Sequence, residues 1–347
     1  MRLRRTWVTA VALAGAVAWQ IPAGAIEPIP DTPGWRGFVI AGAGYVELRS
    51  NFVSGNDLVD IGAPRLGSLA ARPARDDAFL PVFTGEINYT FGRGWQAFFG
   101  TSLEDAVTLD NVMQLGARKD LGAAGIVQAG LLYAGIPTRT WEDPYAEGVR
   151  RERTDLDSTG FRVQWDRIME TGLELTFSYR AVSIDEERSG SGVTSVPCAL
   201  VCRELLRRDG DQYSFDASYL FRLGATGNHL VRPQVRYTID ERDGNALAGD
   251  SYQLQLSHVY VTPRYTIASN IAYGEVSRDA VNPVVGVKTD EDRFMVGSTF
   301  FYGLPALGAG WQAVAGVLWG QDDSSSRFHD AEAFLVNVGL MYRFGAR

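Results

Sequence analysis

The stretch NVGLMYRFGAR, from Asn337 to Arg347, shows the pattern on which the prediction of the fold is built. Successive side chains of a strand point to opposite faces. Together with Val336, one face of this segment holds the apolar and aromatic residues Val336, Val338, Leu340, Tyr342 and Phe344. The other face holds Asn337, Gly339, Met341 and Arg343. Such a strand fits either a soluble β-sandwich or a β-barrel in a membrane, so the rest of the chain must decide.

The same period-two alternation recurs along the chain and predicts an all-β fold. About fourteen segments show it, and weak alternation in three of them leaves twelve or sixteen strands as alternatives. An even number places both ends of the chain on one side of a barrel. We expect strands at 36–50, 81–91, 95–104, 110–119, 125–135, 156–167, 173–184, 211–222, 229–240, 251–261, 264–276, 291–302, 311–321 and 331–344.

The N-terminus has the pattern of a secretion signal. A basic start is followed by an apolar core from Thr6 to Trp19 and by Ala23-Gly24-Ala25, which is typical of a cleavage site. We therefore expect a signal peptide at 1–25, a periplasmic segment at 26–35 and a barrel at 36–344. No later segment is apolar for the ~18 residues of a membrane helix. The net charge of -8 argues against a nucleic-acid partner.

The connections between the expected strands alternate in length, which favours a membrane barrel. Short ones, such as 92–94 and 262–263, alternate with long charged ones, such as 51–80 and 185–210. Outer-membrane barrels have short periplasmic turns and long external loops. Aromatic residues also gather beside the short turns, as in an interfacial girdle. The sequence therefore predicts one transmembrane antiparallel up-and-down barrel in the cell outer membrane.

Charged residues fix which face of each strand looks inward. A charge facing lipid at mid-bilayer costs roughly 2–4 kcal/mol, so the polar faces must line the lumen. Opposed acids and bases would create a transverse field there, and the arginine excess suggests a mild preference for anions. The expected lumen-lining residues are Glu86, Glu104, Arg118, Arg162, Asp166, Glu174, Arg180, Asp216, Arg222, Arg232, Arg236, Arg293 and Arg343.

Two resemblances sharpen this prediction. Asn337, Gly339, Tyr342 and Phe344 resemble the C-terminal recognition signal of Gram-negative outer-membrane proteins, although three residues follow the phenylalanine. That implies handling by the barrel-assembly machinery. Nearly the whole mature chain resembles an uncharacterised, porin-like family, domain of unknown function 2860, which implies a barrel but no activity. The segments that carry this resemblance are 102–110, 141–145, 165–168, 185–190, 208–213 and 281–293.

The segment VPCALVCRELLRR (196–208) lies in a long external loop and holds both cysteines. Export permits a disulfide between Cys198 and Cys202, and two free thiols are the alternative. A short amphipathic helix here would group Leu200, Val201, Leu205 and Leu206 on one side. It would then act either as a gate that brings arginines to the mouth or as a solvated cap.

Three functions follow from these features. The first is a passive or gated pore for small polar or anionic solutes. The second is a closed structural barrel that interacts with outer-membrane lipid and lipopolysaccharide, with external acids bridged by divalent cations. The third is an outer-membrane hydrolase, for which Asp322, Asp323, His329 and Asp330 supply candidate groups but no recognisable partner. We expect no enzyme activity, cofactor or dedicated metal site, a polar rather than an apolar lumen, and a monomer.

Overall fold

The structure is a computed structural model that describes residues 28–56, 58–102, 112–134, 138–195 and 199–345. No helix in these ranges is long and apolar enough to cross a membrane. The strands are β1 (Gly34–Arg49), β2 (Val53–Asn56), β3 (Arg75–Gly92), β4 (Trp95–Gly100), β5 (Val112–Asp120), β6 (Ile126–Ala134), β7 (Thr138–Trp141), β8 (Arg153–Asp166), β9 (Leu173–Ile184), β10 (Gly210–Tyr219), β11 (Phe221–Leu223), β12 (His229–Arg242), β13 (Gly249–Val261), β14 (Tyr265–Arg278), β15 (Glu291–Gly303), β16 (Trp311–Ser324) and β17 (Ala331–Phe344).

Within the described residues, four short helices lie in the connections. They are η1 (Gly122–Ala124), η2 (Ile168–Glu170) and η3 (Pro305–Leu307) in short turns, and α2 (Ala199–Leu205) in a long loop. The expected signal peptide at 1–25, Glu104 and Cys198 lie outside the described residues.

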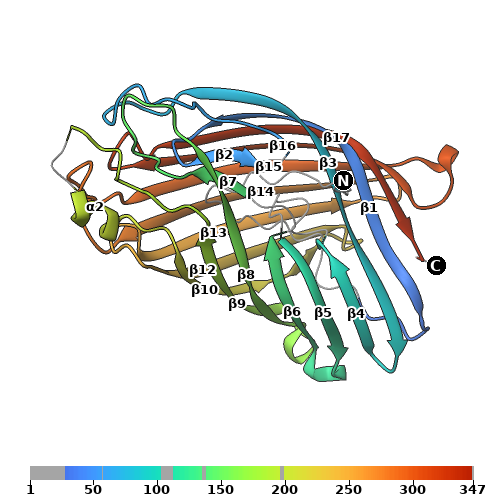
Figure 1. Cartoon of the computed structure of the whole chain (residues 1–347). Coiled ribbons are helices and arrows are strands. Elements are labelled where there is room, and N and C mark those ends of the chain that lie inside the picture. Colours follow the sequence, from blue (N-terminus) through green and yellow to red (C-terminus); the bar gives the residue numbers. More distant parts are fainter. Residues whose placement is uncertain (1–27, 57, 103–111, 135–137, 196–198, 346–347) are drawn as a thin grey trace, which may run out of the picture.

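The strands form one closed antiparallel barrel of fourteen staves, which confirms the predicted fold class and strand count. β1 pairs with β3 on one side and with β17 on the other, so the two ends of the sheet meet. Gly37, near the start of β1, faces Phe344 at the end of β17. The first barrel strand therefore begins and the last one ends at the same rim (Figure 1). β10 and β11 together count as one barrel strand because both pair with β12.

β2 and β7 are additions that the sequence did not predict. They pair with each other, and β7 also pairs with the outer part of β8, above the end of β6. All four residues of β2 are buried, so this strand lies inside the outer end of the barrel. The expected strand 81–91 is also longer than predicted, since β3 begins at Arg75.

The register places a continuous apolar face on the outside. Large apolar side chains such as Phe79, Leu131 and Val338 are 80%, 61% and 59% exposed, whereas their neighbours in sequence are far less exposed. Near the short turns, aromatic rings follow one another around the rim. Trp35 contacts Tyr89 and Trp311 contacts Tyr342, with ring centroids 4.8 and 4.9 Å apart. This is the girdle expected of a barrel in a bilayer.

The long loops at the opposite end fold together into a lid with its own apolar core. That core is contributed by five separate loops and contains Tyr145, Cys202, Leu206, Ala246, Val284 and Phe328. A second cluster joins the first loop to the barrel wall, because Val53 and Ile61 pack on the inward side chains of Val46, Leu80 and Leu335. The outer end of the lumen is thus occupied by packed loop residues.

Candidate functional site: the barrel interior and its lid

The interior has two chemically different walls. One rung of paired residues shows the change, since it runs from Val46 (β1) to Leu335 (β17), Leu318 (β16) and Gly297 (β15). It continues through Asn270 on β14 to Ser257 on β13 and Arg232 on β12. The wall formed by β14 to β17 and β1 is therefore largely apolar. The wall that runs from the C-terminal half of β3 to β13 is largely polar.

The apolar wall corrects the expectation of a lumen lined throughout by polar residues. Phe38, Ile40, Phe301, Val314 and Met341 form one buried cluster on β1, β15, β16 and β17. These strands carry apolar residues on both faces, so alternation of polar and apolar residues cannot identify the inward face. Asn270 lies where the two walls meet, and within the described part of the chain neither polar atom of its buried carboxamide has a hydrogen-bond partner.

The charged residues of the polar wall are joined in pairs between nearby strands. Nη2 of Arg118 on β5 donates to both carboxylate oxygens of Glu86 on β3, at 3.1 and 3.2 Å. Arg236 on β12 donates to Asp216 on β10 at 2.5 Å. Arg232 on β12 pairs with Glu174 on β9. Each of these three pairs joins nearby strands of one wall rather than opposite sides of the lumen.

Neighbouring amides and hydroxyls complete these ion pairs. Arg118 also donates to Gln128 at 2.5 Å and to Gln96 at 3.2 Å. Its guanidinium lies 4.4 Å from the ring centroid of Phe98. Buried charges are tolerated when they are paired and hydrogen-bonded in this way. The polar wall is therefore neutralised locally rather than presenting a row of free arginines.

Most of the predicted lumen residues lie at inward positions, but two are not among them. Arg222 is exposed on β11 at the short-turn rim, and Glu104 lies outside the described residues. Arg293 is at the outer rim, where it donates to Glu291 at 2.5 Å and lies 3.7 Å from Asp322. Those at inward positions are Glu86, Arg118, Arg162, Asp166, Glu174, Arg180, Asp216, Arg232, Arg236, Arg293 and Arg343.

A polar cluster lies in the centre of the lid. The hydroxyl of Tyr145 is 2.9 Å from Nε2 of His329 and accepts a hydrogen bond of 3.0 Å from Nδ2 of Asn282. Burial lowers the pKa of His329 to about 4. The same burial raises the pKa of Tyr145. Both rings are therefore neutral at pH 7, as the apolar surroundings require.

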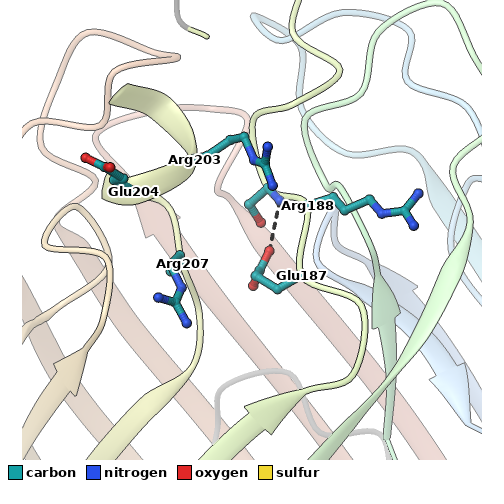
Figure 2. Close-up of a pocket in the computed structure, with 6 residues that line it drawn as sticks. Glu187, Arg188, Arg203, Glu204 and Arg207 are labelled. Atoms are coloured by element: carbon teal, nitrogen blue, oxygen red, sulfur yellow. Dashed lines mark hydrogen bonds between the residues drawn. The ribbon is translucent and has the colours of Figure 1, made fainter. Parts of the chain in front are cut away.

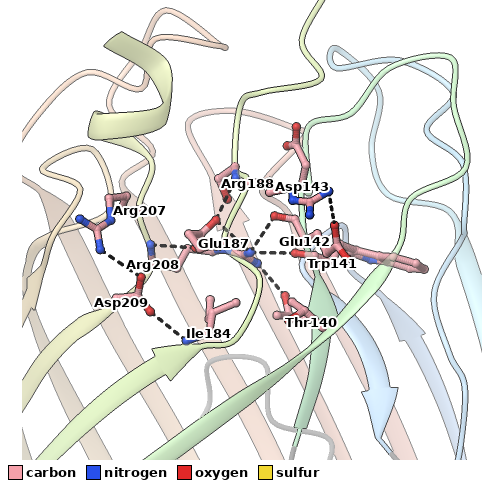
Figure 3. A network of polar contacts seen from close by, with 12 residues as sticks. Thr140, Trp141, Glu142, Asp143, Ile184, Glu187, Arg188, Arg207, Arg208 and Asp209 are labelled. Atoms are coloured by element: carbon pink, nitrogen blue, oxygen red, sulfur yellow. Dashed lines mark hydrogen bonds and ion pairs between the residues drawn. The ribbon is translucent and has the colours of Figure 1, made fainter. Parts of the chain in front are cut away.

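Arg208 fastens the lid to β7 (Figure 3). Its Nε donates to Glu187 at 2.8 Å, its Nη1 to the hydroxyl of Thr140 at 2.7 Å and its Nη2 to the carbonyl of Trp141 at 2.7 Å. The side chains of Arg208 and Glu187 are only 11% and 10% exposed. One guanidinium thus joins the two ends of the loop between β9 and β10 to each other and to β7, and we call this group the Arg208 latch.

Helix α2 forms within the segment where the sequence predicts an amphipathic helix, but its buried side differs in part. Cys202 and Leu206, four residues apart, are fully buried, whereas Val201 is 63% exposed. Cys202 is disulfide-bonded. Arg208 points into the latch, while Arg207 remains half exposed and pairs with Asp243 at 2.9 Å.

The groups considered for a hydrolase do not converge. Asp322 faces inward at the end of β16 and Asp323 faces outward. His329 is 7% exposed and its Nε2 contacts the phenol of Tyr145. A nucleophile needs a base within hydrogen-bond reach, and among the described residues His329 has no serine, threonine or cysteine hydrogen-bonded to its ring.

A closed barrel with an apolar outer face, aromatic girdles and a lumen partly lined with ion pairs defines a membrane β-barrel of the outer-membrane type. The model of one protein family, a protein of unknown function (DUF2860), matches residues 34–343. The chain belongs to this family, as its sequence motifs predicted. No curated protein matches the chain in sequence.

Several solved outer-membrane proteins are similar to the chain in structure. The CymD monoaromatic hydrocarbon channel is 9% identical, with a TM-score of 0.46 over 95% of each chain. The COG4313 outer membrane channel from Pseudomonas putida F1 is 11% identical, with a TM-score of 0.43 over 93% of this chain and 100% of that one. OccAB2 of Acinetobacter baumannii is 10% identical, with a TM-score of 0.37 over 92% and 100%. At these identities the likeness concerns the fold alone.

Proposed function

We propose that this outer-membrane barrel is a gated pore for small polar or anionic solutes. The observation that carries the proposal is the neutralised polar wall beside the apolar wall. A solute that moves between them meets hydrogen-bonding groups on one side and no strong trap of either charge. Conduction requires binding that is favourable enough for entry and weak enough for exit.

Among the residues predicted for the lumen, arginines outnumber acids, and this supports a mild preference for anions. Among the residues predicted for the lumen, seven arginines stand at inward positions, namely Arg118, Arg162, Arg180, Arg232, Arg236, Arg293 and Arg343. Four acids stand with them, namely Glu86, Asp166, Glu174 and Asp216. Because the acids neutralise part of this charge, we expect weak rather than strong selectivity.

The lid supports the gated form of the proposal. Its apolar core and the Arg208 latch cover the outer end, so the structure described here corresponds to a closed state. Loops at a channel mouth come from the low-stability part of a protein, and a local opening of the lid would admit a solute. The second candidate, a closed structural barrel without conductance, draws on the same dense packing.

Single-channel recording in planar bilayers tests both candidates. The parent chain and a variant lacking residues 190–207 are compared, with folding of both checked by heat-modifiable mobility on gels. A gated pore predicts rare steps in the parent and frequent ones in the deletion variant. The reversal potential in a salt gradient then reads the selectivity. A deletion variant that inserts fully yet stays silent would refute the pore and favour the structural barrel.

A further inference from the structure

A crevice opens between helix α2 and the turn that follows β9 (Figure 2). Its volume is about 410 Å³, and its walls are Glu187, Arg188, Ser189, Arg203, Glu204 and Arg207. Gly190, with a φ of +80°, lets the turn approach the helix closely, since a Cβ there would lie only 3.0 Å from Leu206 and 3.1 Å from Cys202. The crevice is within the size range of small-molecule sites.

Two hydrogen-bond donors in this crevice lack acceptors. The hydroxyl of Ser189 is buried and has no hydrogen-bond partner among the residues that the structure describes, and the residue is 2% exposed. Arg203 extends from α2 toward the turn, while the carboxylate of Glu204 points away from it (Figure 2). In the described part of the chain no ion pair joins Arg203 to a carboxylate. An unpaired buried polar group costs roughly 1–3 kcal/mol, so an acceptor is expected for the hydroxyl of Ser189. Arg203 is exposed and therefore accessible to a ligand from solvent.

The acids near the crevice are already engaged elsewhere. The two oxygens of Glu187 accept from Nε and Nη2 of Arg208 at 2.8 and 3.2 Å, and one of them also accepts from the backbone N–H of Ser189 at 2.9 Å. Arg188 is held by Glu142 at 3.2 Å, and Arg207 by Asp243 at 2.9 Å. These pairs leave Arg203 and Ser189 as the donors open to a ligand.

We propose that this crevice binds an oxyanion, either a carboxylate or a phosphate, through Arg203 and Ser189. A guanidinium gives charge-assisted hydrogen bonds to such groups, and the serine hydroxyl adds a neutral one. The volume leaves room for a small organic body beside the anionic group. If the barrel is the pore proposed above, on which this inference rests, the crevice is the first capture site for an anionic solute at the outer face of the lid.

Titration calorimetry on the full barrel in detergent tests the site, with inorganic phosphate and acetate as probes. Arg203→Gln removes the charge at an exposed helix position, and Ser189→Ala removes the hydroxyl. Arg65→Gln changes an exposed arginine elsewhere in the loops and serves as the control. We expect about tenfold weaker binding in Arg203→Gln, the loss of a charge-assisted hydrogen bond, a smaller loss in Ser189→Ala, and no change in the control.

Equal affinity of the parent and Arg203→Gln, or absence of binding in the parent, would overturn the proposal. Vesicles containing lipopolysaccharide with and without its phosphates separate the two sources of anion. A membrane source predicts Arg203-dependent binding to the phosphorylated vesicles, whereas a soluble source predicts it for free acetate and phosphate in detergent. Conductance is measured in parallel. A silent barrel that still binds through Arg203 refutes the pore alone, and a conducting barrel without such binding refutes the crevice alone.

Discussion

The hydroxyl of Tyr145 and Nε2 of His329 lie 2.9 Å apart in the centre of the lid, although 184 residues separate them in the chain. Asn282 donates to that hydroxyl, which leaves the hydroxyl free to donate to Nε2. The hydrogen of the neutral imidazole then resides on Nδ1, which is buried and finds no partner in the described ranges. Protonation would therefore place a charge in an apolar core, next to groups that already use their donors and acceptors.

Acid should open the lid through His329. Its pKa is about 4 in the closed lid and would return to about 6.5 when the ring meets water. The open form therefore binds the proton more readily, and closure weakens as pH falls from about 6.5 toward 4. Near the ring, Glu291 favours its protonation and Arg278 opposes it.

Hydrogen exchange of the lid amides measures this effect. After correction for intrinsic rates, exchange around Phe328 and Leu206 should rise about tenfold between pH 7 and 5.5. A His329→Gln variant lacks the titrating group, so its lid should show a flat response over the same range. Equal slopes in the parent and the variant would mean that another group controls the lid.

The Arg208 latch gives a second prediction. Replacing Arg208 by Met leaves the carboxylate of Glu187 buried without its main partner, a change that costs about 3 kcal/mol in buried pairs. The lid should open more often, with more frequent channel steps and faster exchange at Trp141. Adding Glu187→Gln removes the stranded charge and should restore part of the closure. A double variant no more stable than Arg208→Met would contradict this account.

The ion pair of Asp216 and Arg236 makes a third prediction, about selectivity. Asp216→Asn leaves Arg236 without its carboxylate, so the reversal potential should shift toward anions. Arg236→Gln removes the guanidinium beside Asp216, to which Gln234 also donates at 2.8 Å, and the shift should be toward cations. Asp216→Asn keeps the size of the side chain, whereas Arg236→Gln keeps a polar side chain that is shorter. Two shifts of the same sign, or none, would show that these residues do not face the conducting path.

The sequence predicts the barrel wall well because alternation is a local signal. All fourteen expected strands have a counterpart in the structure, including the terminal strand from Ala331 to Phe344. β2 and β7 were not predicted because each has only four residues, and the four of β2 are all buried. A period of two cannot be read where both faces of a strand are covered.

The interior was harder to predict than the wall. Phe38 and Ile40 face inward on a strand whose outer face carries Val39 and Ala41, so both faces look apolar in sequence. The lid core depends on contacts between loops distant in the chain, such as that of Tyr145 with Phe328, whose ring centroids are 5.2 Å apart. Nothing local in either loop indicates that contact. The Arg208 latch could not be predicted for the same reason.

Gly339 provides the fourth prediction, at the seam that closes the barrel. The sequence places it in the C-terminal assembly signal, and the structure adds a steric requirement. It faces Gly42 across the pair β1–β17, and a Cβ on it would lie 2.7 Å from the carbonyl oxygen of Ala41. Gly339→Ala should therefore weaken closure by about 1–3 kcal/mol, the usual cost of overpacking.

Refolding of the purified chain separates the two roles of Gly339, because no assembly machinery is present in that experiment. If sterics at the seam matter, Gly339→Ala refolds less completely in detergent than the parent, as heat-modifiable mobility on gels would report. Gly67→Ala is the matched control, since nothing lies within 4 Å of a Cβ there. Normal refolding of Gly339→Ala, together with poor assembly in cells, would assign the glycine to recognition alone.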